Sequence, residues 1–183
     1  MTHDPSSAVQ RDPDGRLRHL ITLEGLSAAE MVGLLNLAQF YLREAGDIPA
    51  RDQILWGRTV ANLFFEPSTR TRVSFELAAL RLGADVVNLD MQSSSRVKGE
   101  TVLDTIYTLQ AMHADILVMR DAEPGLPAYV AKFVAPHISI LNAGEALRAR
   151  ELARARHQVV RCSDAQLGHS QRRERLPRRP RNA

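Results

Sequence analysis

The chain has 183 residues, of which 44% are hydrophobic and 25% are charged, an ordinary composition for a folded domain. Its Gly and Pro content is average, which excludes a collagen-like or wholly disordered chain. The formal charge of +3 is divided unevenly. Residues 1–144 hold 13 Lys and Arg against 17 Asp and Glu, whereas residues 145–183 hold 11 against 4.

Features of membrane, secreted and zinc proteins are missing from the sequence. The aliphatic stretches are only a few residues long, so we expect no membrane-spanning helix. Asp4 and Pro5 interrupt the region where a secretory signal has basic and then apolar residues. Cys162 is the single cysteine, and no Cys/His cluster has zinc-ligand spacing. We therefore expect a cytoplasmic protein without a disulfide, a metal or a membrane partner.

The first predicted helix follows a polar leader. Residues 1–16 have no apolar periodicity, and we predict a mobile leader without a role. Ser27 followed by Glu30 forms a capping-box pattern. Apolar residues then recur at helical spacing as far as Leu42, which predicts an amphipathic helix that ends near Gly46.

Short apolar runs then alternate with helical patterns. Strands are predicted over residues 59–65, 85–89, 115–119 and 138–141. Helices are predicted from Pro67 to a C-cap at Gly83, over residues 99–113 and over residues 126–133. This alternation predicts an α/β fold, in which a parallel four-stranded sheet has helices on both faces.

The character of the sequence changes after Gly144. Residues 145–183 contain 11 Arg, no aromatic residue and six Leu or Val, which is too little for a hydrophobic core. One helix is predicted as far as about Arg156, and the rest is predicted to be disordered. The chain is thus divided into a leader (1–16), one domain (17–144) and an Arg-rich tail (145–183).

An anion site is predicted where the first strand meets the next helix. Ser68, Thr69, Arg70 and Thr71 follow Pro67 at this junction. The first turn of a helix presents backbone N–H groups without partners, which bind phosphate, and an Arg adds a bidentate fork. In the alternative interpretation, Ser68 or Thr69 is a simple N-cap and the two arginines, Arg70 and Arg72, lie on a solvated helix face.

The residues around this junction favour the anion site because they resemble a known family. Residues 64–76, Phe-Phe-Glu-Pro-Ser-Thr-Arg-Thr-Arg-Val-Ser-Phe-Glu, resemble the carbamoyl-phosphate signature of aspartate carbamoyltransferases. Residues 93–101, 115–120 and 141–144 resemble that family's mobile loop, its arginine-bearing strand and its next strand end. The resemblance extends from residue 17 to residue 144. Ornithine carbamoyltransferases share the Ser-Thr-Arg-Thr-Arg core but resemble the lead-in and the loop less well.

The resemblance implies a reaction and a set of site residues. The family transfers the carbamoyl group of carbamoyl phosphate to the amine of L-aspartate, giving N-carbamoyl-L-aspartate and phosphate in pyrimidine biosynthesis, without a metal or organic cofactor. It implies that the phosphate is bound by the four residues from Ser68 to Thr71. It implies that Arg120 reaches both the phosphate and the carbonyl oxygen. Ser94 and Lys98 would enter a neighbouring subunit's site, which implies a homotrimer. The implied catalytic residues are Arg70, Thr71, Lys98 and Arg120.

The sequence departs from the family after Gly144. The family continues there into a His-Pro-Thr-Gln segment, whereas His157-Gln158 lacks the intervening residues, so no role is assigned to His157. The 39 residues of the tail are too few for an aspartate-binding domain of about 150 residues. We therefore expect this chain to be inactive alone.

Three interpretations of the tail remain open. An out-of-frame translation would explain its abrupt Arg-rich composition. In the second, the chain is a half-protein that binds carbamoyl phosphate or joins an intact enzyme's trimer without catalysis. A nucleic-acid-binding arm is the third, because Arg residues neutralise phosphates, but the tail offers no aromatic residue for base stacking.

Overall fold

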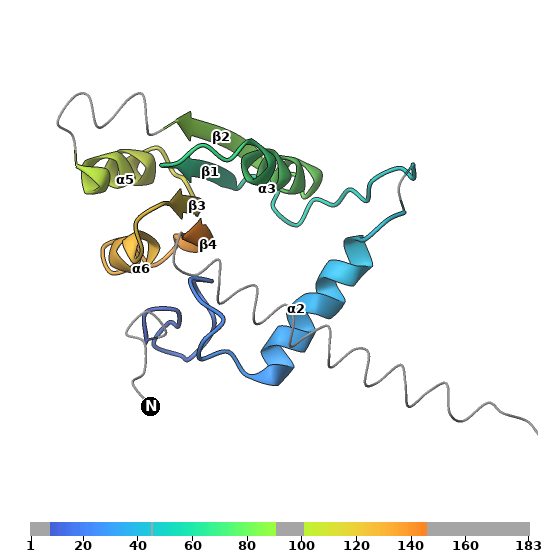
Figure 1. The fold of residues 1–183 in the computed structure, drawn as a ribbon, viewed down its shortest axis with the longest axis horizontal. Helices are drawn as coiled ribbons and strands as arrows, with labels where there is room; N and C mark the ends of the chain where they lie inside the picture. The colour runs from blue at the N-terminus through green and yellow to red at the C-terminus, as the bar shows by residue number, and fades with distance from the viewer. Residues whose placement is uncertain (1–7, 45, 91–100, 146–183) are drawn as a thin grey trace, which may run out of the picture. The chain divides into compact units, whose positions relative to one another are not determined.

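The computed structural model describes residues 8–44, 46–90 and 101–145. Its four strands form one parallel sheet in the order β2-β1-β3-β4 (Figure 1). The elements in chain order are α2 (Ala28–Tyr41), β1 (Thr59–Phe64), α3 (Thr69–Arg81), β2 (Asp85–Asp90), α5 (Val102–Ala111), β3 (Ile116–Asp121), α6 (Leu126–Val130) and β4 (Ser139–Glu145). The predicted α/β class and the parallel four-stranded sheet are confirmed.

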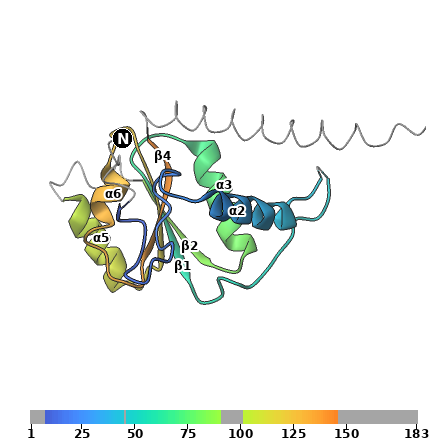
Figure 2. The ribbon, with the colours of Figure 1, turned by 90° about the horizontal axis from the view of Figure 1, so that it is seen from below.

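Helices cover both faces of this sheet, as predicted. Figure 2 shows α3 on one side and α5 and α6 on the other. The strand order explains this arrangement. The chain steps from β1 outward to β2, then returns past β1 to β3 and continues to β4. Because parallel crossovers are right-handed, steps in opposite directions place their helices on opposite faces.

The side chains of β1 alternate between two hydrophobic clusters. Ala61 and Leu63 pack in the cluster that includes Ile106 of α5. Val60 and Phe64 pack in the cluster that includes Ala79 of α3. Five of the six β1 residues are buried, which is typical of a central strand with helices on both faces.

The segment before α2 lies along the free edge of β4. The Leu20 N–H donates to the Ile140 carbonyl at 2.8 Å, and the Asn142 N–H donates to the Leu20 carbonyl at 2.9 Å. His19, which is only 1% exposed, accepts the Ile140 N–H on Nδ1 at 3.0 Å. This segment therefore satisfies backbone groups that an edge strand otherwise leaves open.

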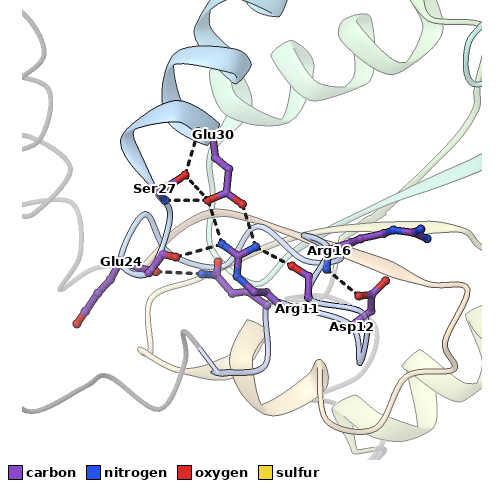
Figure 3. Close-up of polar contacts among 9 residues, drawn as sticks. Arg11, Asp12, Arg16, Glu24, Ser27 and Glu30 are labelled. Atoms are coloured by element: carbon purple, nitrogen blue, oxygen red, sulfur yellow. Dashed lines mark hydrogen bonds and ion pairs between the residues drawn. The ribbon is translucent and has the colours of Figure 1, made fainter.

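Residues 8–16 are part of this packing, so the prediction of a mobile leader as far as residue 16 is wrong for them. Gln10 is 2% exposed, and its Oε1 accepts the N–H groups of Ile21 and Thr22, both at 2.8 Å. Arg11 forms two hydrogen bonds with Glu30, at 2.9 and 3.0 Å (Figure 3). These contacts are polar, and for that reason a search for apolar periodicity misses them. Residues 1–7 lie outside the described residues.

The predicted capping box of α2 is confirmed. Ser27 Oγ accepts the Glu30 N–H at 3.2 Å, and the Glu30 carboxylate accepts the Ser27 N–H at 2.8 Å (Figure 3). The helix ends at Tyr41, before the predicted end near Gly46, and none of its residues is buried. Phe40, for example, is 65% exposed.

The remaining helices differ from the predictions only at their ends. Gly83 follows α3 with a φ of +86°, as the predicted C-cap requires. α5 begins after Thr101 with a capping box to Asp104, and α6 ends at Val130. The predicted start of α5 at residue 99 and the predicted properties of residues 146–183 lie outside the described residues. Across the part of the chain that is described, no helix has the length and apolarity needed to span a membrane.

His19 is expected to make stability depend on pH. Burial, with a contribution from Arg18, lowers the pKa of His19 from 6.5 to about 4. The unfolded chain therefore takes up this proton at a higher pH than the folded chain does. The free energy of unfolding should be constant above pH 6.5 and fall towards pH 4, by up to roughly 3 kcal/mol. Urea unfolding of wild type and His19→Gln between pH 7 and pH 4 measures the difference.

The exposed His113 provides the matched control for that experiment. His113→Asn suits its positive φ of 61° and should retain the wild-type pH dependence. A wild-type slope in His19→Gln would contradict the assignment.

The pair of Arg11 and Glu30 is expected to lose its contribution in acid. Hydrogen bonds from Arg11 and then from Ser27 lower the pKa of Glu30 from 4.5 to about 2. Because the folded pKa is below the unfolded value, the contribution is present above pH 4.5 and lost as the pH falls towards 2. Glu30→Gln should therefore lower the urea midpoint at pH 7 and have less effect at pH 3. Glu24→Gln, at an exposed position, is the control and should leave the urea midpoint unchanged.

Candidate functional site

The candidate site lies at the carboxyl ends of β1 and β3. These strands are neighbours, and Phe64 pairs with Arg120 in their register. The chain leaves β1 towards α3 on one face of the sheet and leaves β3 towards α6 on the other. Ligands of open α/β sheets bind in the crevice that such a divergence creates.

The first turn of α3 provides the first half of the site. Ser68 occupies the N-cap position, but its side chain makes no capping hydrogen bond. Its Oγ instead donates to Thr71 Oγ1 at 2.9 Å. The first N–H groups of a helix have no partner within the helix, so those of this turn are available to an anion. The alternative in which the Ser68 side chain simply caps α3 is not observed.

Arg70 and Arg72 differ in their surroundings on this turn. Arg70 is exposed, whereas Arg72 is half-buried, and its N–H donates to the Ser68 carbonyl at 3.0 Å. The structure thus brings Ser68, Thr69, Arg70 and Thr71 together in one helical turn. An exposed guanidinium beside this turn is free to offer two donors to a phosphate.

Arg120 provides the second half of the site, from the end of β3. Its Nε lies 2.5 Å from Glu66 Oε1, and its Nη1 donates to the Ala143 carbonyl at 3.0 Å. The side chains of Arg120 and Glu66 are 28% and 24% exposed, so the pair is accessible to a ligand. The guanidinium is therefore held at the carboxyl ends of three adjacent strands and is partly neutralised by one carboxylate.

Sequence reasoning missed the roles of Glu66, which pairs with Arg120, and of Glu145, which binds Asn142 and Gly125 nearby. Glu66 was part of the recognised motif but had no role of its own. Glu145 was assigned to the tail, whereas it is 3% exposed and is the last residue of β4. Its carboxylate accepts the Asn142 side-chain amide at 2.8 Å and the Gly125 N–H at 3.1 Å. For Glu66, an acidic residue directly after the predicted strand over residues 59–65 was the available signal.

Two predicted site residues, Ser94 and Lys98, lie outside the described residues, and their positions are not assigned. Across residues 8–44, 46–90 and 101–145, no group of three or more His, Cys, Asp or Glu side chains is arranged to hold a metal ion. A cavity of about 430 Å³ lies at the other end of α3, beside Arg81 and Tyr41, away from the first turn.

Most of the chain matches a known family. The family model for the aspartate/ornithine carbamoyltransferase carbamoyl-P binding domain matches residues 18–149. This match includes the sheet, α3 and Arg120, and it extends five residues beyond Gly144.

Solved structures of aspartate transcarbamoylase from Trypanosoma cruzi are similar to the same region. The complex with aspartate and phosphate is 36% identical, with a TM-score of 0.60, over 80% of this chain and 44% of that chain. The complex with carbamoyl phosphate is 37% identical, with a TM-score of 0.59, over the same shares. The complex with carbamoyl phosphate and aspartate is 41% identical, with a TM-score of 0.59, over 70% and 39%.

The matched part of this chain spans less than half the length of those enzymes. Within that part, the parallel sheet, the Ser-Thr-Arg-Thr turn and the arginine at the end of β3 occur in one continuous match. The chain belongs to the aspartate/ornithine carbamoyltransferase family.

Proposed function

We propose that this chain binds carbamoyl phosphate between the first turn of α3 and Arg120, as the carbamoyl-phosphate half of an aspartate carbamoyltransferase. The observation that carries the proposal is the convergence of these two groups of donors at the carboxyl ends of β1 and β3. Membership in the family supports the same ligand.

The first turn of α3 is suited to the phosphate group. Backbone N–H groups and the positive end of the helix dipole attract an anion there. The linked hydroxyls of Ser68 and Thr71 lie in the same turn, 2.9 Å apart, and either can rotate to donate to a phosphate oxygen. Arg70 adds a charged fork from the exposed side of the turn.

Arg120 is suited to the carbamoyl carbonyl and to the bridging part of the ligand. Attack by an amine on this carbonyl develops negative charge on its oxygen, and a guanidinium directed at that oxygen lowers the barrier. The same cation stabilises the departing phosphate. Because Glu66 holds Arg120 at 2.5 Å, the ligand must compete with this carboxylate or share the guanidinium with it.

L-Aspartate is the proposed acceptor. The Trypanosoma cruzi relatives include complexes with aspartate and with carbamoyl aspartate, which supports the aspartate enzyme over the ornithine enzyme. Since the match spans less than half of those enzymes, we expect carbamoyl-phosphate binding from this chain and turnover only with the remaining half. The proposed setting is a cytoplasmic homotrimer that acts in pyrimidine biosynthesis.

Loss of the Arg70 guanidinium is expected to weaken carbamoyl-phosphate binding. A charge-assisted hydrogen bond to phosphate contributes about 1.5–3 kcal/mol, so Arg70→Ala should raise Kd by roughly tenfold or more. Isothermal titration calorimetry of the full chain measures this change.

Arg81→Ala is the matched control, because Arg81 is at the last turn of the same helix. It should leave Kd unchanged while removing the same charge. Equal effects of the two substitutions would show that only net charge matters and would overturn the assigned site.

Lys98 is expected to act only between subunits. The resemblance implies that its loop enters a neighbouring site, so Lys98→Ala should weaken carbamoyl-phosphate binding in a trimer and have no effect in a monomer. Sedimentation velocity establishes the oligomeric state at the concentration of each titration. A weakened Kd in a proven monomer would rule out the shared site, and Lys132→Ala, which removes the chain's other lysine, is the control.

A further inference from the structure

Gly144 lies against the guanidinium of Arg120. A Cβ atom at this position would be 2.6 Å from Nη1 and 3.5 Å from Cζ of Arg120. Favourable contacts between carbon-sized atoms begin near 3.5 Å, so the first distance is a steric overlap and the second is ordinary contact. The absence of a side chain at Gly144 is therefore what leaves room for Nη1 at its observed position.

The backbone around Gly144 is fixed by side-chain hydrogen bonds. The Gly144 N–H donates to Asn142 Oδ1 at 2.9 Å, and the Asn142 Nδ2 donates to Glu145 Oε1 at 2.8 Å. The other oxygen of Glu145 accepts the Gly125 N–H at 3.1 Å. Asn142 also donates to the Ile21 carbonyl at 3.0 Å. The end of β4 is thus tied to the start of α6 and to the N-terminal segment.

The end of β4 also contributes an acceptor to Arg120. Nη1 donates to the Ala143 carbonyl at 3.0 Å, so the atom that Gly144 accommodates is also the atom that Ala143 binds. On the other side of the guanidinium, Nε faces Glu66. The direction of Arg120 is therefore set by a carboxylate on one side and by the backbone of β4 on the other.

We infer that Gly144 is a positioning residue for carbamoyl-phosphate binding, which acts by leaving space for the Arg120 guanidinium at the end of β4, where Asn142 and Glu145 hold the backbone. The inference rests on the proposed function of Arg120.

An alanine at Gly144 would displace Arg120 rather than the strand. Nη1 is at the end of a flexible side chain, whereas the Gly144 backbone is held by the bond of its N–H to Asn142 and by the pairing of Glu145 with Asp121, which follows an irregularity in the β3–β4 register. The easier adjustment is rotation of the guanidinium away from Ala143. The φ of +126° at Gly144 adds backbone strain to the same substitution, so the test must separate strain from displacement.

The test is a double-substitution cycle on the Kd of carbamoyl phosphate, measured by calorimetry on the full chain. Gly144→Ala should raise Kd by roughly tenfold, the loss of about one charge-assisted hydrogen bond. In an Arg120→Lys background, Gly144→Ala should have little effect on Kd. The lysine Nζ would lie near the position of Arg120 Cζ, and a Cβ at residue 144 is 3.5 Å from that position, an ordinary contact distance. An equal loss in both backgrounds would show that strain is responsible and would overturn the inference.

Gly57→Ala is the matched control. Gly57 also has a positive φ, +71°, and a Cβ there would meet nothing within 4 Å. This variant should lower the thermal midpoint through strain and leave Kd unchanged. A Kd in Gly144→Ala that equals that of wild type or of Gly57→Ala would overturn the inference.

A spectroscopic readout separates this inference from the proposed function. The Arg120 Nε–Hε resonance in a ¹H–¹⁵N spectrum, assigned by its loss in Arg120→Lys, should shift in Gly144→Ala and stay in place in Gly57→Ala. Glu145→Gln, which replaces one acceptor oxygen by a donor, should shift it in the same way. If wild type binds no carbamoyl phosphate, the proposed function fails, and the resonance alone decides whether Gly144 positions Arg120. An unshifted resonance in Gly144→Ala overturns the inference.

Discussion

The site depends on the point at which the chain reverses its direction across the sheet. β1 leads outward to β2, and β3 leads outward to β4, so the two central strands send their connections to opposite faces. The carboxyl ends of β1 and β3 are therefore covered by neither connection. Polar groups gather at this edge, whereas the hydrophobic clusters fill the two faces behind it.

The two halves of the site are rigid for different reasons. At the first turn of α3 the donors are backbone N–H groups, whose directions are fixed once the helix forms. At the end of β3 the donor is a long side chain, which needs external contacts to select one direction. Glu66 and Ala143 provide those contacts, and the absence of a side chain at Gly144 leaves room for the guanidinium. The site thus combines helix N–H groups that have no partner within the helix with an arginine, Arg120, that is already bonded to Glu66 and Ala143.

Much of the fold follows from local patterns in the sequence, and the errors have a common physical cause. Buried strands and capped helices have apolar runs and capping residues that a short window detects, as the capping box at Ser27 shows. The packing of residues 8–16 depends on the polar side chains of Gln10 and Arg11, which no hydrophobic pattern reveals. The Ser68–Thr71 turn was predictable as an anion site. The support of Arg120 by Gly144 was not, because it depends on a contact between a side chain of β3 and the backbone of β4 that no pattern within a short window shows.

The contact of the N-terminal segment with β4 has a consequence for synthesis of the protein. His19 bonds to Ile140 across 121 residues, and Asn142 bonds to Ile21 across the same separation. Domains generally fold as units during synthesis, so this domain cannot complete its fold before the strand that its first segment joins has been made. Its first segment has no edge to join until β4 has left the ribosome. That segment must remain unpaired during most of the elongation of this domain, and the acceptor that Ala143 offers to Arg120 arrives with the same last strand.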